Sequence, residues 1–291
     1  MPDKILIYVD QAGLQTTLQD LGRPGYQAQG IPLGGALDRR SAIQANYLVG
    51  NALTEPVLEI TLLGPKLIFE QGAQIALTGA DLSAELNGQP LPTYQTVAIQ
   101  AGDILRFGKP RKGCRAYLAV GGAWIVRNWL GSASLATQQV KLLTPDSLLQ
   151  KGQRIEIKFQ QFIKPRMLRP DPLPKEEPTL KLLPGPEFEL FPNTYIAHFF
   201  AQSYTVSPSS NRMGYRLEPT IPDYSWPQEN ISSGIVPGTI QITNQGQAIV
   251  LMADAQTVGG YPRLANLSND SLHHMAQLRP GDNLRFQLKD T

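Results

Sequence analysis

The 291-residue sequence predicts a mainly β protein with a few helices. Its 26 glycines and 24 prolines recur between short runs rich in Ile, Val, Leu and Thr, as expected for many short strands joined by tight turns. Helical periodicity is convincing only at Asp38–Val49 and over the short stretch Asp270–Gln277. Asp38 is expected to cap the first of these helices, because its side chain accepts from free amides of the first turn.

A change of composition divides the chain into two halves of comparable size. The stretch 164–178, KPRMLRPDPLPKEEP, contains five prolines and clustered charges, which cannot continue a sheet. We therefore expect a β-rich N-terminal subdomain over residues 1–163, a proline-rich linker over 164–178, and a β-rich C-terminal subdomain over 179–291.

The two halves share three short pieces in the same order. The first piece reads as strand, Gln-Gly turn, strand in both halves, and the second is a Gly-Asp turn that opens a strand. The pieces are 64–77 with 238–251, 101–107 with 280–286, and 23–26 with 212–215. Three matches in one order indicate an internal duplication of a β-rich unit. Ligands of such a duplicated fold are expected at the seam, where loops of both halves converge.

Composition argues against several classes of function. A formal net charge of +2, without a basic run that carries aromatic residues, disfavours a nucleic-acid partner. No apolar stretch approaches the ~20 residues that cross a bilayer, and Ile5–Val9 is typical of a first strand rather than a signal peptide. Cys114 is the only cysteine and is expected to be a buried thiol, so the cytoplasm is the simplest compartment.

A metal site is not expected. The neighbours His273 and His274 point ~100° apart on a helix, which prevents them from sharing one ion easily.

Three segments break the strand pattern and hold the polar candidates. The glycine-rich segment 13–38 precedes a helix start, where amides bind anions, although a plain surface loop explains it equally well. In 211–217, NRMGYRL, two arginines flank a Gly-Tyr turn and are expected to point to one side, while separate surface ion pairs are the alternative. The third segment, 254–262, has the sequence DAQTVGGYP. It holds a carboxylate, an amide, a hydroxyl and a tyrosine close together, which is more polar groups than a turn needs when it only reverses the chain.

These segments together resemble the biotin-dependent carboxyltransferase family, which includes the urea amidolyase carboxyltransferase half, a sporulation-kinase-inhibitor antagonist and the C subunit of 5-oxoprolinase. Seven pieces match in order, from about Val9 to Phe286. They are QDLGRPGYQAQGIPLGGALD (19–38), AN-LVGN (45–51), LEITLLGP (58–65), GCRAYLAVGG (113–122), NRMGYRL (211–217), GTIQI (238–242) and DAQTVGGYP (254–262). The resemblance implies two related cyclophilin-like β-barrel domains.

The resemblance also implies partners and a reaction. For a stand-alone bacterial chain it implies the C subunit of an ATP-dependent 5-oxoprolinase, which opens 5-oxoproline to glutamate together with a kinase-inhibitor-like B subunit and a lactam-utilisation-like A subunit. ATP is expected to be shared with those partners, since the chain has no P-loop. One alternative is a carboxyltransferase subunit of urea-carboxylase type, with biotin on a separate carrier because none of the five methionines adjoins a lysine. Another is a non-catalytic antagonist of a kinase-inhibitor-like partner.

Candidate site residues follow from these segments. We expect cations for phosphoryl and carboxylate oxygens, carboxylates for water activation or for orienting an arginine, and polar groups for the substrate. The catalytic candidates are Asp38, Asp254, Arg212 and Tyr261; the substrate-binding candidates are Gln19, Asp20, Arg23, Arg115, Arg216, Gln256, Thr257, Gly259 and Gly260.

The sequence departs from the family pattern at three places. The loop 131–143, GSASLATQQVKLL, lacks a hydroxyl where threonine is usual and is shortened, which puts substrate specificity in question. Pro219 follows Arg-Leu-Glu where a glycine is expected, and Ala248 replaces a common proline.

Overall fold

The computed structural model describes residues 3–136, 142–170, 173–174, 176–222 and 231–289. The chain forms two compact units: Met1–Arg23 with Gly34–Leu173, and Pro24–Leu33 with Pro174–Thr291. The boundary after Leu173 lies inside the proline-rich stretch 164–178. The segment Pro24–Leu33, which the sequence places in the N-terminal half, is part of the second unit.

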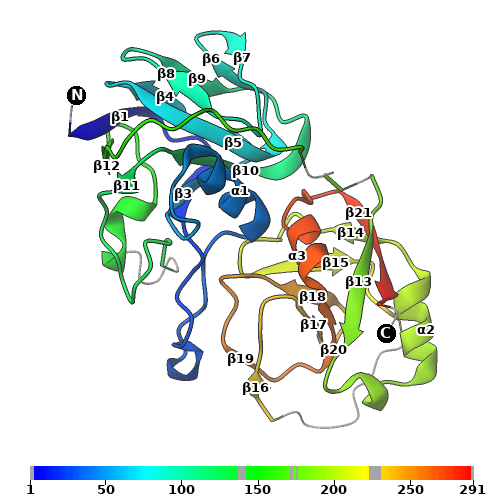
Figure 1. Ribbon diagram of the computed structural model, residues 1–291. Helices are drawn as coiled ribbons and strands as arrows, with labels where there is room; N and C mark the ends of the chain where they lie inside the picture. The colour runs from blue at the N-terminus through cyan, green and yellow to red at the C-terminus, as the bar shows by residue number, and fades with distance from the viewer. Residues whose placement is uncertain (1–2, 137–141, 171–172, 175, 223–230, 290–291) are drawn as a thin grey trace. The chain divides into compact units, whose positions relative to one another are not determined.

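The first unit contains two antiparallel sheets and one α-helix (Figure 1). A seven-stranded sheet has the order β11-β12-β1-β4-β9-β6-β7 and a five-stranded sheet the order β2-β3-β10-β5-β8. The elements of this unit are β1 (Lys4–Gln11), β2 (Gln15–Gln19), α1 (Arg39–Val49), β3 (Val57–Thr61), β4 (Lys66–Phe69), β5 (Ala73–Asp81), β6 (Ala84–Leu86), β7 (Gln89–Pro90), β8 (Val97–Ile99), β9 (Ile104–Phe107), β10 (Lys112–Val120), β11 (Ala123–Trp124), a 3₁₀ turn η3 (Pro145–Ser147) and β12 (Arg154–Lys158).

Alternation of side chains builds the core of the first unit. In β1 the residues Ile5, Ile7 and Val9 are buried, while the residues between them are more exposed, as the two-residue period of a strand requires. They belong to one apolar cluster with residues of both sheets. The opposite face of the five-stranded sheet is covered by α1, as the predicted apolar stripe of 38–49 indicates.

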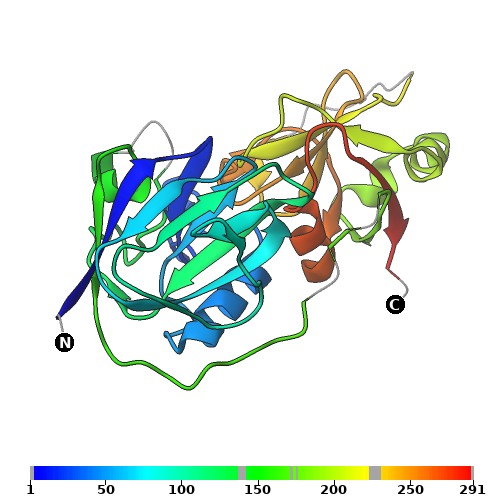
Figure 2. The ribbon, with the colours of Figure 1, turned by 90° about the horizontal axis from the view of Figure 1, so that it is seen from above.

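The start of the proline-rich stretch packs on the first unit. Arg166 donates from Nη1 to the carbonyl of Tyr47 at the end of α1, and its backbone N–H donates to Thr96 Oγ1. Figure 2 shows this extended segment running past α1. Residues 164–168 are therefore tied to the first unit.

The second unit is a closed barrel of seven strands, in the order β13-β20-β17-β18-β15-β14-β21. The barrel closes through the parallel pair β13 and β21. The elements of this unit are η1 (Gln27–Gln29), β13 (Thr179–Pro184), η4 (Phe188–Leu190), α2 (Asn193–Ala201), β14 (Tyr204–Val206), β15 (Gly214–Glu218), β16 (Ser233–Gly234), β17 (Thr239–Ile242), β18 (Ala248–Leu251), β19 (Val258–Gly259), β20 (Arg263–Leu267), α3 (Asn269–Met275) and β21 (Asn283–Leu288).

Aromatic packing joins α2 to the barrel. The ring of Phe199 stacks on Phe286 of β21 with centroids 5.2 Å apart, and Tyr204 lies 5.5 Å from each of them. Burial of this cluster raises the pKa of the Tyr204 hydroxyl. The sequence analysis did not predict α2, a nine-residue helix whose buried residues Tyr195 and Phe199 lie on one face.

The predicted mainly β fold with few helices is confirmed, and the second unit is a closed barrel. Asp38 caps α1 and accepts from the Ser41 amide, as expected, and α3 begins one residue before the predicted Asp270. Cys114 is buried in β10, also as expected. Across the part of the chain that the structure describes, no helix is both long and apolar enough to pass through a membrane.

The three matched pieces of the proposed duplication differ in how far their structures agree between the halves. The turns 100–103 and 279–282 are built alike: the N–H of Gln100 and of Arg279 each donates at 2.8 Å to the aspartate three residues later. The glycines of the two turns have nearly the same backbone angle, with a φ of +90° at Gly102 and +89° at Gly281. The strands that follow these turns are β9 and β21.

The strand pairing of the other piece differs between the halves. β17 and β18 form a hairpin, whereas the corresponding β4 and β5 lie in different sheets of the first unit. The match between 23–26 and 212–215 is wrong. Gly25 lies in a loop with a φ of +94°, whereas Gly214 begins the strand β15.

Candidate functional site

An arginine–carboxylate pair lies just beyond two paired strands of the barrel. The ladder of β15 and β18 continues past their ends, where Met252 N donates to Met213 O and Asp254 N donates to Arg212 O. This places the two side chains together: Arg212 Nε lies 2.8 Å from Asp254 Oδ2, and Nη2 lies 3.0 Å from Oδ1. The side chains are 6% and 16% exposed. The bidentate contact fixes the plane of the guanidinium and balances its charge.

Arg216 does not share this place. Gly214 and Tyr215 begin β15 instead of forming a turn, so the expectation that Arg212 and Arg216 point to one side of a turn is wrong. Arg216 is exposed and donates to Gln247 Oε1 at 3.4 Å. Arg212 lies before the strand and is buried, whereas Arg216 lies within the strand and is exposed.

The segment 254–262 continues from the pair as a compact turn. Ala255 N donates to Met252 O, and the Thr257 carbonyl accepts from Ile235 N. At Gly259 an added Cβ would lie 2.6 Å from Gln241 Nε2. Tyr261 is 43% exposed and its carbonyl accepts from Gln241 Nε2. Gly260 is exposed.

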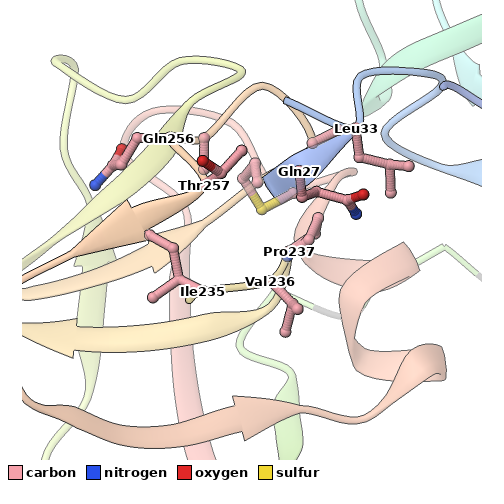
Figure 3. Close-up of a pocket in the computed structure, with 10 residues that line it drawn as sticks. Gln27, Leu33, Ile235, Val236, Pro237, Gln256 and Thr257 are labelled. Carbon is pink, nitrogen blue, oxygen red and sulfur yellow. The ribbon is translucent and has the colours of Figure 1, made fainter. Parts of the chain in front are cut away.

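A small pocket borders this turn and lies within the second unit (Figure 3). It is shallow and open to solvent, and its own free space is about 10 Å³. Its walls come from the turn after β18, from the segment before β17, and from Pro24–Leu33. The lining residues are Gln27, Leu33, Ile235, Val236, Pro237, Met252, Ala253, Ala255, Gln256 and Thr257.

In the first unit, Asp20 is held by neutral donors. Its Oδ1 accepts from Gly22 N, Ser132 Oγ and Ser134 Oγ at 2.6–2.7 Å, and its Oδ2 accepts from Ala133 N at 2.7 Å. Only 8% of the residue is exposed. Both carboxylate oxygens are thus engaged in tying the chain after β2 to the segment 132–134.

Arg23 ties down the same segment. It is 3% exposed, its Nη2 donates to Ser134 O at 2.6 Å, and its guanidinium carbon lies 5.0 Å from the centre of the Trp129 ring. Asp20 and Arg23 therefore come together around 129–134. The remainder of the loop 131–143 that departs from the family pattern, residues 137–141, lies outside the described residues.

Asp38 and Arg115 belong to a buried network around Glu59. Glu59 Oε2 accepts from Leu37 N at 2.8 Å and from the Tyr117 hydroxyl at 3.0 Å, and Arg115 Nε lies 3.6 Å from Oε1. The Tyr117 oxygen accepts in turn from Asp38 N. Burial and the neighbouring charges of Glu59 and Asp38 raise the pKa of Tyr117 well above its ordinary value. The hydroxyl therefore stays protonated and donates to Glu59.

The start of α1 already holds an anion of its own chain. Asp38 accepts through Oδ1 from Ser41 N and through Oδ2 from Ser41 Oγ, and the residue is 5% exposed. A carboxylate is the group that a helix N-terminus favours, because amides and dipole are both positive there. The binding that the sequence assigned to an external anion is thus made by Asp38 itself.

Gln19 lies in β2 with no exposed surface. Its Nε2 donates to Thr17 Oγ1 at 3.0 Å, and its Oε1 has no hydrogen-bond partner among the described residues. Thr17 and Gln19 lie on the face of the sheet that also carries Glu59, because Thr17 faces Glu59 across the β2–β3 pair.

The candidates therefore gather at three places, one in the second unit and two in the first. Arg212, Asp254, Gln256 and Thr257 gather at the turn and pocket of the second unit. Asp20 and Arg23 gather at 129–134, and Asp38 and Arg115 at Glu59. That Arg23 also joins Arg212 and Asp254 in one cleft stays a prediction, because it belongs to the other unit.

Sequence reasoning missed four residues that organise these places. Glu59 had a signal, since a charge inside the apolar run Val57–Thr61 is unusual in a buried strand. Ser132 and Ser134 were noted only as part of a family motif. Gln27 had no signal beyond its glycine-rich surroundings, because the pocket depends on segments far apart in sequence.

The described residues do not contain a cluster of three or more His, Cys, Asp and Glu side chains arranged to hold a metal ion. The residues of the chain do not fit a resident biotin either, because no lysine stands next to a methionine.

The second unit is a closed seven-stranded barrel with a small pocket bordered by loops. The chain belongs to the family described as carboxyltransferase domain, subdomain A and B, whose model matches residues 29–288. It is 36% identical to the C subunit of 5-oxoprolinase from Escherichia coli K12 over 281 residues, which cover 97% of this chain and 90% of that protein.

Two further similarities extend the family. The chain is 30% identical to urea amidolyase of Saccharomyces cerevisiae, covering 96% of this chain and 16% of that much longer protein. Its fold matches the crystal structure of TTHA0988 with a TM-score of 0.88 and 31% identity, covering 99% of this chain and 56% of that one.

Proposed function

We propose that the chain is the C subunit of an ATP-dependent 5-oxoprolinase, which opens the lactam of 5-oxoproline to glutamate together with an A and a B subunit. The observation that carries this proposal is the match to the C subunit of a bacterial 5-oxoprolinase over nearly the full length of both chains. A relative that this chain matches over nearly its whole length supports a shared activity better than a longer relative of which this chain covers only a small part.

The polar turn of the second unit gives the proposal its chemistry. Lactam hydrolysis driven by ATP needs a fixed cation for developing negative charge and polar groups that orient the amide. Asp254 orients the Arg212 guanidinium through two hydrogen bonds, and Gln256 and Thr257 follow in the same turn. ATP is proposed to bind with the partner subunits, and the complex to work in the cytoplasm.

Reconstitution tests the proposal. Purified A, B and C proteins are mixed with 5-oxoproline and ATP, and glutamate and ADP are measured. We expect stoichiometric formation of both products, and loss of turnover when this chain is omitted. Full activity of A and B without it would refute its role as an enzyme subunit.

A second function is supported by the family itself. The carboxyltransferase-domain match and the similarity to urea amidolyase favour a biotin-dependent carboxyltransferase subunit, with biotin on a separate carrier. Avidin distinguishes the two, because it sequesters a biotinylated carrier and stops carboxyl transfer. Activity of the A, B and C mixture that avidin leaves unchanged favours the oxoprolinase.

A further inference from the structure

The segment Pro24–Leu33, called the arm below, belongs to the second unit, while the residues on both sides of it belong to the first. These flanking residues are fastened within the first unit. Ala36 N donates to Asp20 O at 2.9 Å, and Arg23, directly before the arm, donates from Nη2 to Ser134 O at 2.6 Å. The arm is therefore a loop on a fixed base.

The arm keeps its shape through hydrogen bonds of its own. The carbonyl of Tyr26 accepts from Gln29 N at 3.0 Å and from Ile31 N at 3.3 Å, and Gly30 N donates to Gln27 O at 3.0 Å. None of these bonds involves the barrel strands. The turn at the centre of the arm can therefore persist when the arm leaves the barrel.

Side chains of the arm meet the barrel at the pocket of Figure 3. Gln27 and Leu33 are half-buried and line it, and in Figure 3 the Gln27 side chain lies between Leu33 and Pro237. On the barrel side, Met252 and Ala255 are 0% and 7% exposed. The free space of about 10 Å³ holds about one water molecule, so the arm fills the place where a larger cavity would lie without it.

Glycines in left-handed conformations stand near both ends of the arm. The φ angle is +94° at Gly25 and +65° at Gly34, which directly follows the arm. An added Cβ at Gly25 would meet nothing within 4 Å, so its glycine serves the backbone conformation and not close packing. A few loop residues of this kind are enough to absorb the change of backbone angles in a hinged motion.

We propose that the arm is a lid, which leaves the barrel as one preformed piece and uncovers Met252 and Ala255 at the turn that begins with Asp254. Opening of this kind breaks side-chain contacts of the arm and keeps its internal hydrogen bonds, so it needs far less free energy than unfolding. Such a lid controls access to the turn whatever reaction the turn serves.

Thiol labelling of the full chain with N-ethylmaleimide tests the lid. Ala255→Cys places a thiol under the arm, and Ala265→Cys makes the same change inside the barrel, where Ala265 is 0% exposed. Mass spectrometry of the peptides separates both from the native Cys114. We expect the Ala255→Cys thiol to react at least ~10²-fold faster than the Ala265→Cys thiol, because only the second requires the barrel to unfold.

A change in the arm shows whether the lid sets this rate. Leu33→Asp removes apolar contact with the barrel and adds a charge, so labelling of the Ala255→Cys thiol should rise ~10-fold, while the Ala265→Cys thiol changes less than ~2-fold. Leu14→Asp, at a residue of the first unit that is 62% exposed, is the matched control and should change neither rate.

Three results would overturn the lid. Equal labelling of the Ala255→Cys and Ala265→Cys thiols would mean that the turn is uncovered only by unfolding of the barrel. A fast Ala255→Cys rate that Leu33→Asp leaves unchanged would mean that the thiol is reached without movement of the arm. An equal rise at both thiols would mean that Leu33 stabilises the whole barrel.

Discussion

Asp20 and Asp254 are both partly or fully buried carboxylates next to strand ends, but they have different partners. Asp20 accepts four hydrogen bonds from serine hydroxyls and backbone amides, while Asp254 is paired with the guanidinium of Arg212. Neutral donors at 2.6–2.7 Å fix a loop and place no further charge nearby. A guanidinium held by one carboxylate places an oriented cation beside a polar turn. The comparison predicts an architectural role for Asp20 and a role in the proposed site for Asp254.

The Glu59 network extends the architectural pattern in the first unit. One carboxylate binds the chain that enters α1, through Leu37 N, and the strand β10, through Tyr117. The Tyr117 hydroxyl oxygen accepts a hydrogen bond from Asp38 N. Ionisable side chains, of the kind that often act in catalysis, connect a loop, the start of a helix and a sheet here.

Asp20→Ala is expected to have the largest effect on folding. It leaves two serine hydroxyls and two backbone amides of a buried region without their acceptor, at a cost of about 3 kcal/mol in the free energy of unfolding. Urea denaturation measures this change. Asp10→Ala is the control, because its ion pair with Lys66 is half exposed and is worth less than ~1 kcal/mol. Equal losses in the two variants would contradict the architectural role of Asp20.

Asp254→Asn is expected to act on catalysis more than on folding. Asparagine keeps the shape and one acceptor but removes the charge that orients Arg212, so turnover in the A, B and C mixture should fall ~10²-fold. Activity is measured per folded molecule, with binding of the B protein retained. The additional change Arg212→Gln removes the unpaired charge and should restore stability without restoring activity.

A purely structural pair would give the opposite result. Asp254→Asn would then lower the thermal midpoint sharply while each folded molecule kept its activity. The double variant would then recover the thermal midpoint, and the activity of each folded molecule would be the same in all variants.

Local chemistry explains what the sequence could predict. Short apolar runs between glycines and prolines predicted strands, and the Asp38 cap with its apolar stripe predicted α1, because each signal lies within a few residues. The Gly-Asp turns at Gly102 and Gly281 were matched for the same reason.

Long-range packing explains the rest. Whether two neighbouring strands form a hairpin, as β17 and β18 do, or enter different sheets, as β4 and β5 do, depends on partners distant in sequence. The same holds for the site. The polar residues of 254–262 predicted a site at Asp254. Its partner Arg212 and the pocket residue Gln27 are brought there only by the barrel and by the segment Pro24–Leu33.

A second arginine–carboxylate pair of the same unit sharpens the comparison, with the smallest expected effect. Glu187 accepts from both the backbone N and Nε of Arg263 at 2.9 Å, and also pairs with its Nη2. These side-chain hydrogen bonds lower the pKa of Glu187. A lowered pKa stabilises the fold at pH values above ~4.3, the unfolded value, and this contribution is lost as pH falls through the folded value.

Glu187→Gln is therefore expected to cost about 1 kcal/mol of unfolding free energy at pH 7, and progressively less below about pH 4. Urea denaturation of both proteins across this range measures the difference. Glu156→Gln, in the exposed pair with Lys4, should show little change at either pH. A difference for Glu187→Gln that is constant with pH would mean that shape rather than charge holds Arg263. Unchanged activity at pH 7 would separate this pair from Arg212 and Asp254, although Arg263 directly follows the segment 254–262.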